Sequence, residues 1–378
     1  MKIFLTATSL QPNYGGPAFS ISRLALALAD GGVEVGLWAS DGSAVASPLL
    51  PATSHVQCLA GTEAKALDGY GEVDLLHDNG IWLPHNHRLA ALAEKRGIPR
   101  VVSTRGMLEP WALSHKKFKK KLAWRLYQEF DLKQARCHIT SGETEARNLK
   151  QFALGVPVVT IPNAVDIPED LAKLRQGSPR AAANPRVNTA LFLGRIYPIK
   201  GLPTLIEAWA RVQPEGWRLC ISGPDEAGHQ KQVEKAVSVA GLGDEVSFTG
   251  PVDPELKTSA FLNADLFVLP SHSESFGMVV AEALAHGLPV LTTTATPWAI
   301  LREKNCGWWV DPTVDGIVEA LHQATRLDPE VLRAMGARGR ELAAAEFSWR
   351  RIADRMRSTY EDVVRGACLA GDRHLQTV

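Results

Sequence analysis

The stretch DLFVLPSHSESFGMVVAEALAHGLPVLTTT (265–294) decides the fold class, because it combines two apolar strands with one apolar helix. Residues 265–271 and 288–294 are typical of short buried strands, and residues 277–287 are typical of a helix that is buried nearly all round. Such a helix carries the chain back to the start of the next strand, so the two strands run parallel and helices cover both faces of the sheet.

The same alternation of strand and helix extends over most of the chain. It is interrupted at RQGSPRAAANPRVN (175–188), which has no periodicity and the composition of a linker. We therefore predict an α/β protein with two Rossmann-like, doubly wound domains, an N-terminal one over 1–170 and a C-terminal one over 186–345. The remaining segment, 346–378, contains one more helix, which by its sequence could pack on either domain.

The composition is that of a globular protein without a strong charge bias. Of the 378 residues, 45% are hydrophobic and 22% charged, and 41 Lys and Arg balance 41 Asp and Glu. This balance argues against a nucleic-acid binder. The five cysteines are scattered and lack metal-site spacing, and neither a signal peptide nor a long apolar run stands out. We expect a cytoplasmic protein.

The common nucleotide-binding motifs are missing from the sequence. No G-x-G-x-x-G follows a strand, no G-x-x-x-x-G-K-[ST] occurs, and no Asp-x-Asp or His/Cys/Asp cluster has metal-ligand spacing. We therefore predict neither a cofactor nor a bound metal. Any ligand phosphate would be neutralised by cationic side chains and backbone N–H groups.

The stretch LGRIYPIKG (193–201) places two such cations at the end of a strand. Arg195 and Lys200 flank the short loop that follows Gly194. They are therefore expected at the carboxyl edge of a parallel sheet, where ligands of this fold class bind. An arginine can hold two phosphate oxygens at once and a lysine adds a point charge, so phosphate binding is the favoured interpretation. A pair of surface charges is the alternative.

Two turns could offer backbone N–H groups to an anion. The turn YGGPAFS (14–20) leads into a helix, and its glycines, including Gly16, permit close approach of a ligand. A tight turn without a ligand fits it equally well. After the strand 265–271, the N–H groups of Gly277 and Met278 open the next helix and point to the same edge of the sheet.

Two glutamates stand near this second turn. Glu274 precedes the helix and could accept hydrogen bonds from sugar hydroxyls. Glu282 lies within the helix among apolar neighbours, so its carboxylate needs a partner, for which a ribose diol is a candidate. The alternative for Glu282 is a solvated helix face.

Together these motifs resemble those of the retaining GT-B glycosyltransferases of family 4 (glycosyl transferases group 1). The resemblance rests on the run from Glu274 through Gly277 to Glu282 and on the GR and KG pairs of 193–201. IPNAVD (161–166) is similar to that family's linker entry, and SFTGPV (247–252) to its base-binding loop. The resemblance covers nearly the whole chain and implies two Rossmann-like domains facing a central cleft.

The resemblance also implies roles for individual residues. A nucleotide-sugar donor would bind mainly to the second domain and the acceptor to the first, to which the final helix would cross back. Glu274 would contact the transferred sugar and Glu282 the ribose. The implied catalytic residues are Arg195, Lys200 and Glu274, and the implied donor-binding residues are Gly16, Gly194, Pro251, Val252, Ser275, Phe276, Gly277, Met278 and Glu282.

The sequence departs from the family pattern in two places. Many members carry a histidine after the strand that here ends VVSTRG (101–106), and that histidine contacts the transferred sugar; this chain has Arg105 instead. His77, after the preceding strand, could partly substitute, so we place both residues on the acceptor or sugar side. The usual GGxxE segment is replaced by ATPWAILRE (295–303).

Residues 115–125 contain the strongest local charge. Apolar side chains interleave Lys116, Lys117, Lys119, Lys120, Lys121 and Arg125. Such a helix could lie on an anionic membrane surface, present a solvated basic face, or contact an anionic acceptor.

From these features we predict a retaining, metal-independent glycosyltransferase. It would move a sugar from a UDP- or GDP-linked donor to a hydroxyl of a glycan or lipid-linked acceptor, in cell-surface polysaccharide or lipopolysaccharide biosynthesis. It would be cytoplasmic, with peripheral attachment to the inner face of the membrane as an option. The alternatives are a nucleotide-sugar 2-epimerase of the same fold and a non-catalytic nucleotide-binding subunit.

Overall fold

The computed structural model describes residues 1–176 and 187–367 and divides the chain into two compact units. Unit 1 comprises Met1–Ala164 and the segment that starts at Trp349, and unit 2 comprises Val165–Ser348. The first crossing falls inside the IPNAVD motif, a few residues before the predicted boundary at 170. Most of the predicted linker, 177–186, lies outside the described residues.

Unit 1 is built on a seven-stranded, fully parallel sheet with the order β3-β2-β1-β4-β5-β6-β7. Its strands are β1 (Lys2–Ala7), β2 (Glu34–Ala39), β3 (Gln57–Leu59), β4 (Leu75–Asn79), β5 (Arg100–Ser103), β6 (Cys137–Thr140) and β7 (Val158–Thr160).

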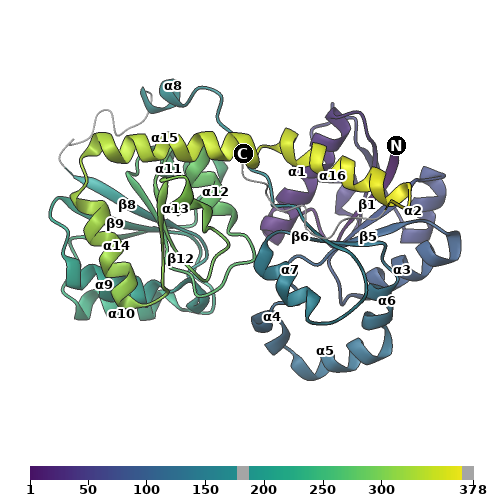
Figure 1. Cartoon of the computed structure of the whole chain (residues 1–378), viewed down its shortest axis with the longest axis horizontal. Helices are drawn as coiled ribbons and strands as arrows, with labels where there is room; N and C mark the ends of the chain where they lie inside the picture. The colour runs from purple at the N-terminus through teal and green to yellow at the C-terminus, as the bar shows by residue number, and fades with distance from the viewer. Residues whose placement is uncertain (177–186, 368–378) are drawn as a thin grey trace. The chain divides into compact units, whose positions relative to one another are not determined.

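Helices cover both faces of this sheet (Figure 1). Alternate residues of β1 show the two faces: Ile3 and Leu5 pack in one cluster with α1 and α16, whereas Phe4 packs in another with α2 and α3. The helices are α1 (Gly16–Asp30), α2 (Glu63–Tyr70), α3 (Pro84–Arg96), α4 (Pro110–Ser114), α5 (Lys117–Ala123), the π-helical turn η3 (Trp124–Gln128), α6 (Glu129–Lys133) and α7 (Glu143–Lys150).

The long helix α16 (Trp349–Val364) belongs to unit 1, although it comes after unit 2 in the chain. It lies beside α1 (Figure 1), and Ile352, Met356 and Tyr360 join the same apolar cluster as β1. One face of the unit 1 sheet is therefore covered by α1 and α16, which lie near opposite ends of the described chain.

Unit 2 repeats this design with a six-stranded parallel sheet in the order β10-β9-β8-β11-β12-β13. The strands are β8 (Asn188–Leu193), β9 (Trp217–Ser222), β10 (Val246–Gly250), β11 (Leu266–Leu269), β12 (Val290–Thr293) and β13 (Gly307–Val310). The helical elements are α8 (Leu171–Gln176), η5 (Pro198–Lys200), α9 (Leu202–Val212), α10 (Gln230–Val239), α11 (Pro254–Leu262), α12 (Met278–Ala285), α13 (Ile300–Glu303), α14 (Val314–Arg326) and α15 (Pro329–Glu346).

Each sheet has one position where the order of the strands reverses. In unit 1 this switch lies between β1 and β4, and in unit 2 between β8 and β11. Connections leave the two neighbouring strands toward opposite faces, which opens a crevice at their carboxyl ends. The predicted residues of 193–201 follow β8, and those of 272–278 follow β11, so both groups come to this switch.

Candidate functional site

Lys200 and Glu274 meet at the switch point of unit 2. The Lys200 ammonium contacts Oε1 of Glu274, and Ser271 Oγ donates to the same oxygen at 2.8 Å. Both side chains are largely buried, with exposures of 15% and 13%. The structure therefore joins two predicted residues that are 74 positions apart in sequence.

Glycines allow the backbone to pack closely around this pair. Gly201 has a φ of +70°, and a Cβ there would lie 2.1 Å from the carbonyl oxygen of Pro270. Gly194 lies against Gly223 in the neighbouring loop, where a Cβ on Gly223 would come within 1.9 Å of the Gly194 oxygen. Neither approach tolerates a side chain, so these glycines fix the loops that hold Lys200.

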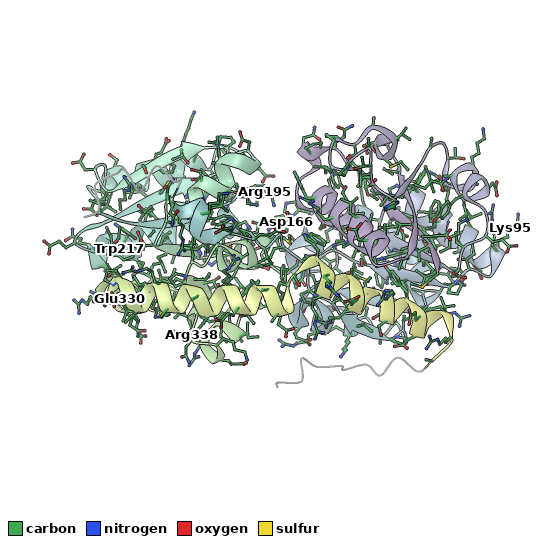
Figure 2. The ribbon with its side chains drawn as sticks, turned by 90° about the horizontal axis from the view of Figure 1, so that it is seen from above. Lys95, Asp166, Arg195, Trp217, Glu330 and Arg338 are labelled. Carbon is green, nitrogen blue, oxygen red and sulfur yellow. The ribbon has the colours of Figure 1, made fainter. Side chains whose placement is uncertain are left out.

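Arg195 lies in the same loop but has a different partner. Its Nη1 is 2.5 Å from Glu226 Oε2, and the two side chains are 58% and 44% exposed. In Figure 2, Arg195 and Trp217 lie at opposite ends of unit 2, as expected for residues at the carboxyl and amino ends of neighbouring strands. An exposed ion pair of this kind contributes little to stability, so the guanidinium can exchange its partner at small cost.

Helix α12 begins at the predicted turn. Gly277 caps it with a φ of +79°, Met278 is its first residue, and Ser275 is partly exposed in the preceding turn. Since the first N–H groups of a helix have no intrahelical acceptor, this end can bind an anion.

Phe276 corrects the sequence prediction, because its side chain is not available to a donor. It is 6% exposed and packs against Trp298 and Phe347 at ring distances of 5.1 and 5.8 Å. Its carbonyl oxygen accepts a 2.5 Å hydrogen bond from Trp298 Nε1. The Phe276 side chain thus holds the turn before α12 against the hydrophobic core of unit 2. Trp298 belongs to the segment 295–303 and is itself buried, between Phe276 and Phe347.

Glu282 has a partner that the sequence did not reveal. Its Oε1 lies 2.5 Å from Lys257 Nζ of α11, with exposures of 22% and 32% for the two side chains. The pair joins α11 to α12 next to the loop of Pro251 and Val252. Nothing in the local pattern around Lys257 identifies it, because the two residues come together only through the packing of the two helices.

Pro251 and Val252 lie at one end of a cavity of about 380 Å³ within unit 2. The cavity runs along β8, β9 and β10 and is bordered by α11. Its walls include the hydroxyls of Ser222 and Thr249, which lie 2.6 Å apart. Its volume is in the range of small-molecule sites.

His77 is a second correction, because the structure buries it completely. Its Nδ1 lies 2.5 Å from the Tyr360 hydroxyl of α16 and its Nε2 2.8 Å from Ser103 Oγ. Burial, with a smaller contribution from the charge of Arg105, lowers the pKa of His77 to about 3. Because this side chain points into the core from β4, it is a structural residue and no sugar can reach it.

Arg105 lies at the carboxyl end of β5 in an unusual backbone conformation, with a φ of +52°. Neighbouring positions in the loops after β4 and β5 also have positive φ: Gly80 (+100°), Trp82 (+79°) and Gly106 (+72°). Positive φ in a residue as bulky as Trp82 stores strain, and such strain clusters at functional sites.

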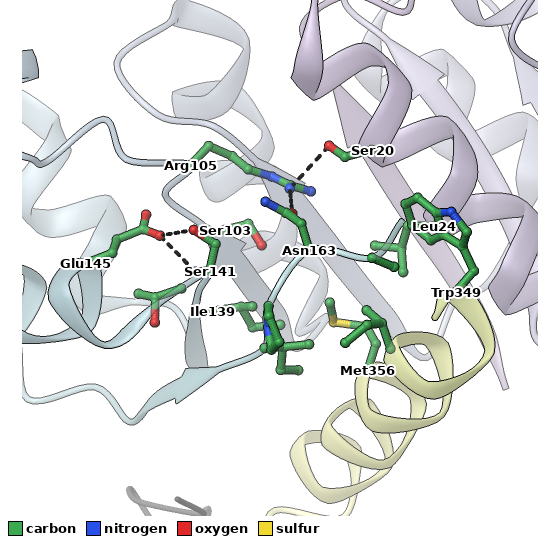
Figure 3. A pocket seen from close by; sticks show the side chains of 15 residues that line it. Ser20, Leu24, Ser103, Arg105, Ile139, Ser141, Glu145, Asn163, Trp349 and Met356 are labelled. Atoms are coloured by element: carbon green, nitrogen blue, oxygen red, sulfur yellow. Dashed lines mark hydrogen bonds between the residues drawn. The ribbon is translucent and has the colours of Figure 1, made fainter. Parts of the chain in front are cut away.

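The Arg105 guanidinium lines a pocket in unit 1 (Figure 3). It donates to Asn79 Oδ1 at 2.6 and 3.0 Å, to Asn163 Oδ1 at 3.1 Å and to Ser20 Oγ at 3.5 Å. Burial lowers the pKa of Arg105, while the Glu145 carboxylate opposes the shift. Ser20 comes from α1, the helix that starts at Gly16, where a Cβ would meet open space.

Glu145 is a further residue that the sequence analysis missed. Its Oε1 accepts from Thr104 Oγ1 and Gly106 N at 2.7 and 2.6 Å, and its Oε2 accepts from the Ser141 N–H and hydroxyl. This buried carboxylate fixes the loop that carries Arg105. The sequence did contain one indication of this role, because Glu145 lies in the first turn of α7, four residues after Ser141.

The basic stretch 115–125 covers the turn before α5, the whole of α5 and the first two residues of η3. Five of its six cations are exposed, and Lys120 turns inward to Ala112 O and the Trp82 ring. Apolar side chains at every fourth position are also exposed: Phe118 by 88%, Leu122 by 60%, Leu126 by 70% and Phe130 by 59%.

Two features are absent from the described parts of the chain, a metal-ligand cluster and a membrane-spanning helix. Within 1–176 and 187–367, no three His, Cys, Asp or Glu residues are grouped so that they could hold a metal ion. Over the same residues, no helix is long and apolar enough to cross a membrane.

Comparisons with known proteins match both units. Residues 14–169 match the model of Glycosyltransferase Family 4, and residues 177–342 match that of Glycosyl transferases group 1. A D-inositol 3-phosphate glycosyltransferase from Segniliparus rotundus is 32% identical over 246 residues, which cover 61% of this chain and 53% of that protein. The chain thus spans about half the length of the curated relatives it matches.

Solved structures agree in fold. Sucrose-phosphate synthase from Thermosynechococcus elongatus superposes with a TM-score of 0.76 at 21% identity, covering 97% of this chain and all of the other. HepE from Anabaena, in complex with UDP and glucose, gives 0.69 at 20% identity, with 96% and 100% covered. With two parallel Rossmann-like sheets and a family model matching each unit, the chain belongs to the group 1, family 4 glycosyltransferases of GT-B fold.

Proposed function

We propose that this protein transfers a sugar from a nucleoside diphosphate sugar, uridine- or guanosine-linked, to a hydroxyl of a glycan or lipid-linked acceptor. The observation that carries the proposal is the Lys200–Glu274 pair at the switch point of unit 2, beside the free end of α12. The UDP and glucose bound by HepE, a protein of similar fold, support a donor of this type.

The positions of the cations suggest how the donor would be held. A diphosphate entering beside α12 would take Lys200 from Glu274 and Arg195 from Glu226, and the freed Glu274 carboxylate would accept hydrogen bonds from the sugar. Glu282 would hold the ribose, with Lys257 keeping its carboxylate in place. The base would lie near Pro251 and Val252.

Chemistry would be electrostatic in this arrangement. As the bond between sugar and phosphate breaks, negative charge accumulates on the leaving diphosphate, and Lys200, Arg195 and the first N–H groups of α12 would stabilise it. We propose that the leaving phosphate takes the proton of the acceptor hydroxyl on the same face of the sugar. The configuration is then retained, and neither an enzyme nucleophile nor a metal is required.

A calorimetric screen of UDP, GDP and their sugars against the full chain tests the proposal. We expect one nucleoside diphosphate to bind, and its sugar to be consumed with retention of configuration when an acceptor is supplied. A protein that binds neither UDP nor GDP would contradict it.

We further propose that the acceptor lies at an anionic membrane, as in cell-surface polysaccharide or lipopolysaccharide assembly, with the protein at the inner face. The exposed apolar stripe that starts at Phe118 is flanked by five exposed cations, which complement anionic headgroups. A strict helix would rotate this stripe by about 40° every four residues. The wider π-helical turn η3 reduces that rotation, so the four side chains stay closer to one line.

Flotation of the full chain with phosphatidylglycerol vesicles at low salt tests membrane attachment. We expect wild type to float and Leu122→Glu to lose most of its binding. Val239→Glu, at an 80% exposed apolar position of unit 2, is the matched control and should float like wild type. Failure of wild type to float would contradict the proposal and favour a soluble acceptor.

A further inference from the structure

The carboxyl-terminal end of α12 is held by two arginine side chains. The backbone N–H groups of residues 286–288 satisfy the carbonyls of residues 282–284. The next carbonyl, that of Ala285, accepts a 2.7 Å hydrogen bond from Nη1 of Arg340 in α15. Arg175 of α8 donates to the two carbonyls that follow, at 3.1 and 3.2 Å. Because the carbonyl end of a helix carries partial negative charge, cations at this end complement the helix dipole.

Arg340 has no carboxylate partner among the described residues. Its Nη2 contacts the carbonyl oxygen of Pro168, so both of its hydrogen bonds go to backbone oxygens. The side chain is partly buried on the inner side of α15. Since no carboxylate neutralises the guanidinium, the negative end of the α12 dipole is the principal partner of its charge.

Helix α15 packs closely against the same end of α12 (Figure 1). A Cβ on Gly336 would lie 2.0 Å from the carbonyl oxygen of Gly287, and a Cβ on Gly339 would lie 2.7 Å from Cδ2 of Leu284. Neither approach tolerates a side chain. Arg340 follows Gly339 directly, so this close packing brings its guanidinium to the end of α12.

The opposite end of α12 is the one that the proposed function assigns to the diphosphate. Apolar packing is not directional, so burial alone does not set how far the N–H groups of Gly277 and Met278 extend along the helix axis. The Lys257–Glu282 pair ties α12 to α11 from the side. At eight residues the helix is about 12 Å long, so a contact that fixes one end also fixes the other. Five of these eight residues are buried: Val280, Ala281, Ala283, Leu284 and Ala285.

We propose that Arg340 is a positioning residue of the donor site. By holding the carboxyl-terminal carbonyls, it fixes the axial position of α12 and thereby places the N–H groups of Gly277 and Met278 against the diphosphate. Its positive charge behind the helix also favours an anion at the opposite end. The inference rests on the proposed function, and Arg340 acts through α12 instead of contacting the donor.

Binding of UDP and of uridine to the full chain tests the proposal, because only UDP carries the phosphates that the helix end would hold. Arg340→Gln should weaken UDP binding about fivefold or more, the scale of a charge at a helix terminus, and leave uridine binding unchanged. Calorimetry measures the affinity for UDP, and ligand-observed NMR measures that for the weaker nucleoside. If the wild type prefers GDP, GDP and guanosine take their place.

Two further variants separate positioning from a general loss of stability. Arg340→Lys keeps the charge and should restore part of the UDP affinity; it also serves as the test if Arg340→Gln does not fold. Arg338→Gln is the matched control, because Arg338 lies on the same helix (labelled in Figure 2) and donates to Asn305 O at 2.9 and 2.7 Å, away from α12. It should bind UDP like wild type. Thermal unfolding of each variant verifies that it is folded.

Three results would overturn the inference alone in a protein that binds UDP or GDP. They are wild-type affinity for the diphosphate in Arg340→Gln, equal losses for diphosphate and nucleoside, and the same selective loss in Arg338→Gln. If the wild type binds neither UDP nor GDP, the proposed function fails and the inference with it.

Discussion

The two units share one architecture but differ at the carboxyl edges of their sheets. In unit 2, each of the cations described above at this edge lies against a carboxylate: Lys200 with Glu274, Arg195 with Glu226, and Lys257 with Glu282. In unit 1, Arg105 has neutral partners and lies in a loop with positive φ. The cations of unit 2 are thus paired with carboxylates, which an anionic ligand could replace. The guanidinium of Arg105 in unit 1 is bound by neutral oxygens instead.

The largest effect is expected at the buried pair of unit 2. Lys200→Ala should lower turnover by about two orders of magnitude or more, because it removes a cation that stabilises the leaving diphosphate. Steady-state kinetics with the donor identified by the screen measures this. Lys304→Ala, at an exposed lysine of the same unit, should leave turnover unchanged. Near-normal turnover in Lys200→Ala would remove Lys200 from the mechanism.

The second largest effect is expected at the Lys257–Glu282 pair, which the sequence did not predict. Glu282→Ala should weaken nucleoside diphosphate binding by about tenfold or more, the scale of a lost hydrogen bond to a charged group. Lys257→Ala should weaken it less, because Lys257 acts by orienting Glu282. In the double variant the two losses should not add, which a calorimetric double-mutant cycle measures. Additive losses would mean that Lys257 and Glu282 act independently.

A third effect should be confined to the core of unit 1. Tyr360→Phe removes the hydrogen bond to His77 and should lower the free energy of unfolding by about 1 kcal/mol. Turnover should stay near that of wild type, since His77 is buried away from any ligand. Denaturant unfolding and kinetics on the same sample verify this. Lost turnover in a protein of normal stability would contradict the structural role of His77.

Acid should destabilise unit 1 through the same core. Burial lowers the pKa of His77 to about 3 and that of His138 to about 4, against an ordinary 6.5. Since the unfolded chain binds these protons first, their stabilising contribution is complete above about pH 6.5 and is lost as the pH falls toward 4 and 3.

Asp78 acts in the opposite direction. Burial raises its pKa to about 6, so acidification between pH 6 and 3.8 returns some stability. We expect the free energy of unfolding to fall on balance as the pH is lowered, and we expect His77→Gln to make this fall smaller. Unfolding free energies measured from pH 7 to 4 test this; an unchanged slope in His77→Gln would contradict it.

The smallest effect is expected at the exposed pair of unit 2. Glu226→Gln should change the free energy of unfolding by less than about 1 kcal/mol, because its partner Arg195 is well solvated. Nucleoside diphosphate binding should be equal or slightly tighter, since the guanidinium no longer has to leave a carboxylate. A tenfold loss of affinity would show that Glu226 contributes to the site.

The sequence predicted unit 2 better than unit 1. Lys200 and Glu274 each follow a buried strand, and strand ends meet at one edge of a parallel sheet, so their meeting could be anticipated. Lys257 could not, because its contact depends on how two helices pack. The burial of the Phe276 side chain could not be predicted either, because an aromatic residue in a motif can pack in the core as well as against a ligand.

In unit 1 the decisive contacts join distant parts of the chain. His77 follows a strand, as a site residue would, but Tyr360 covers it from a helix 283 residues further on. The positive φ of Arg105 and the role of Glu145 depend on a network among three loops. The spacing of residues along the chain does not predict such contacts, because they form only when distant segments pack together.

The most direct test of the central claim is the binding of a nucleoside diphosphate to the charges of unit 2. Calorimetry should show that UDP or GDP binds to the full chain and that Lys200→Ala weakens this binding at least about tenfold. Lys304→Ala should bind like wild type. Equal affinity in wild type and Lys200→Ala, or no binding of either nucleotide to the wild type, would contradict the claim that this edge holds the donor.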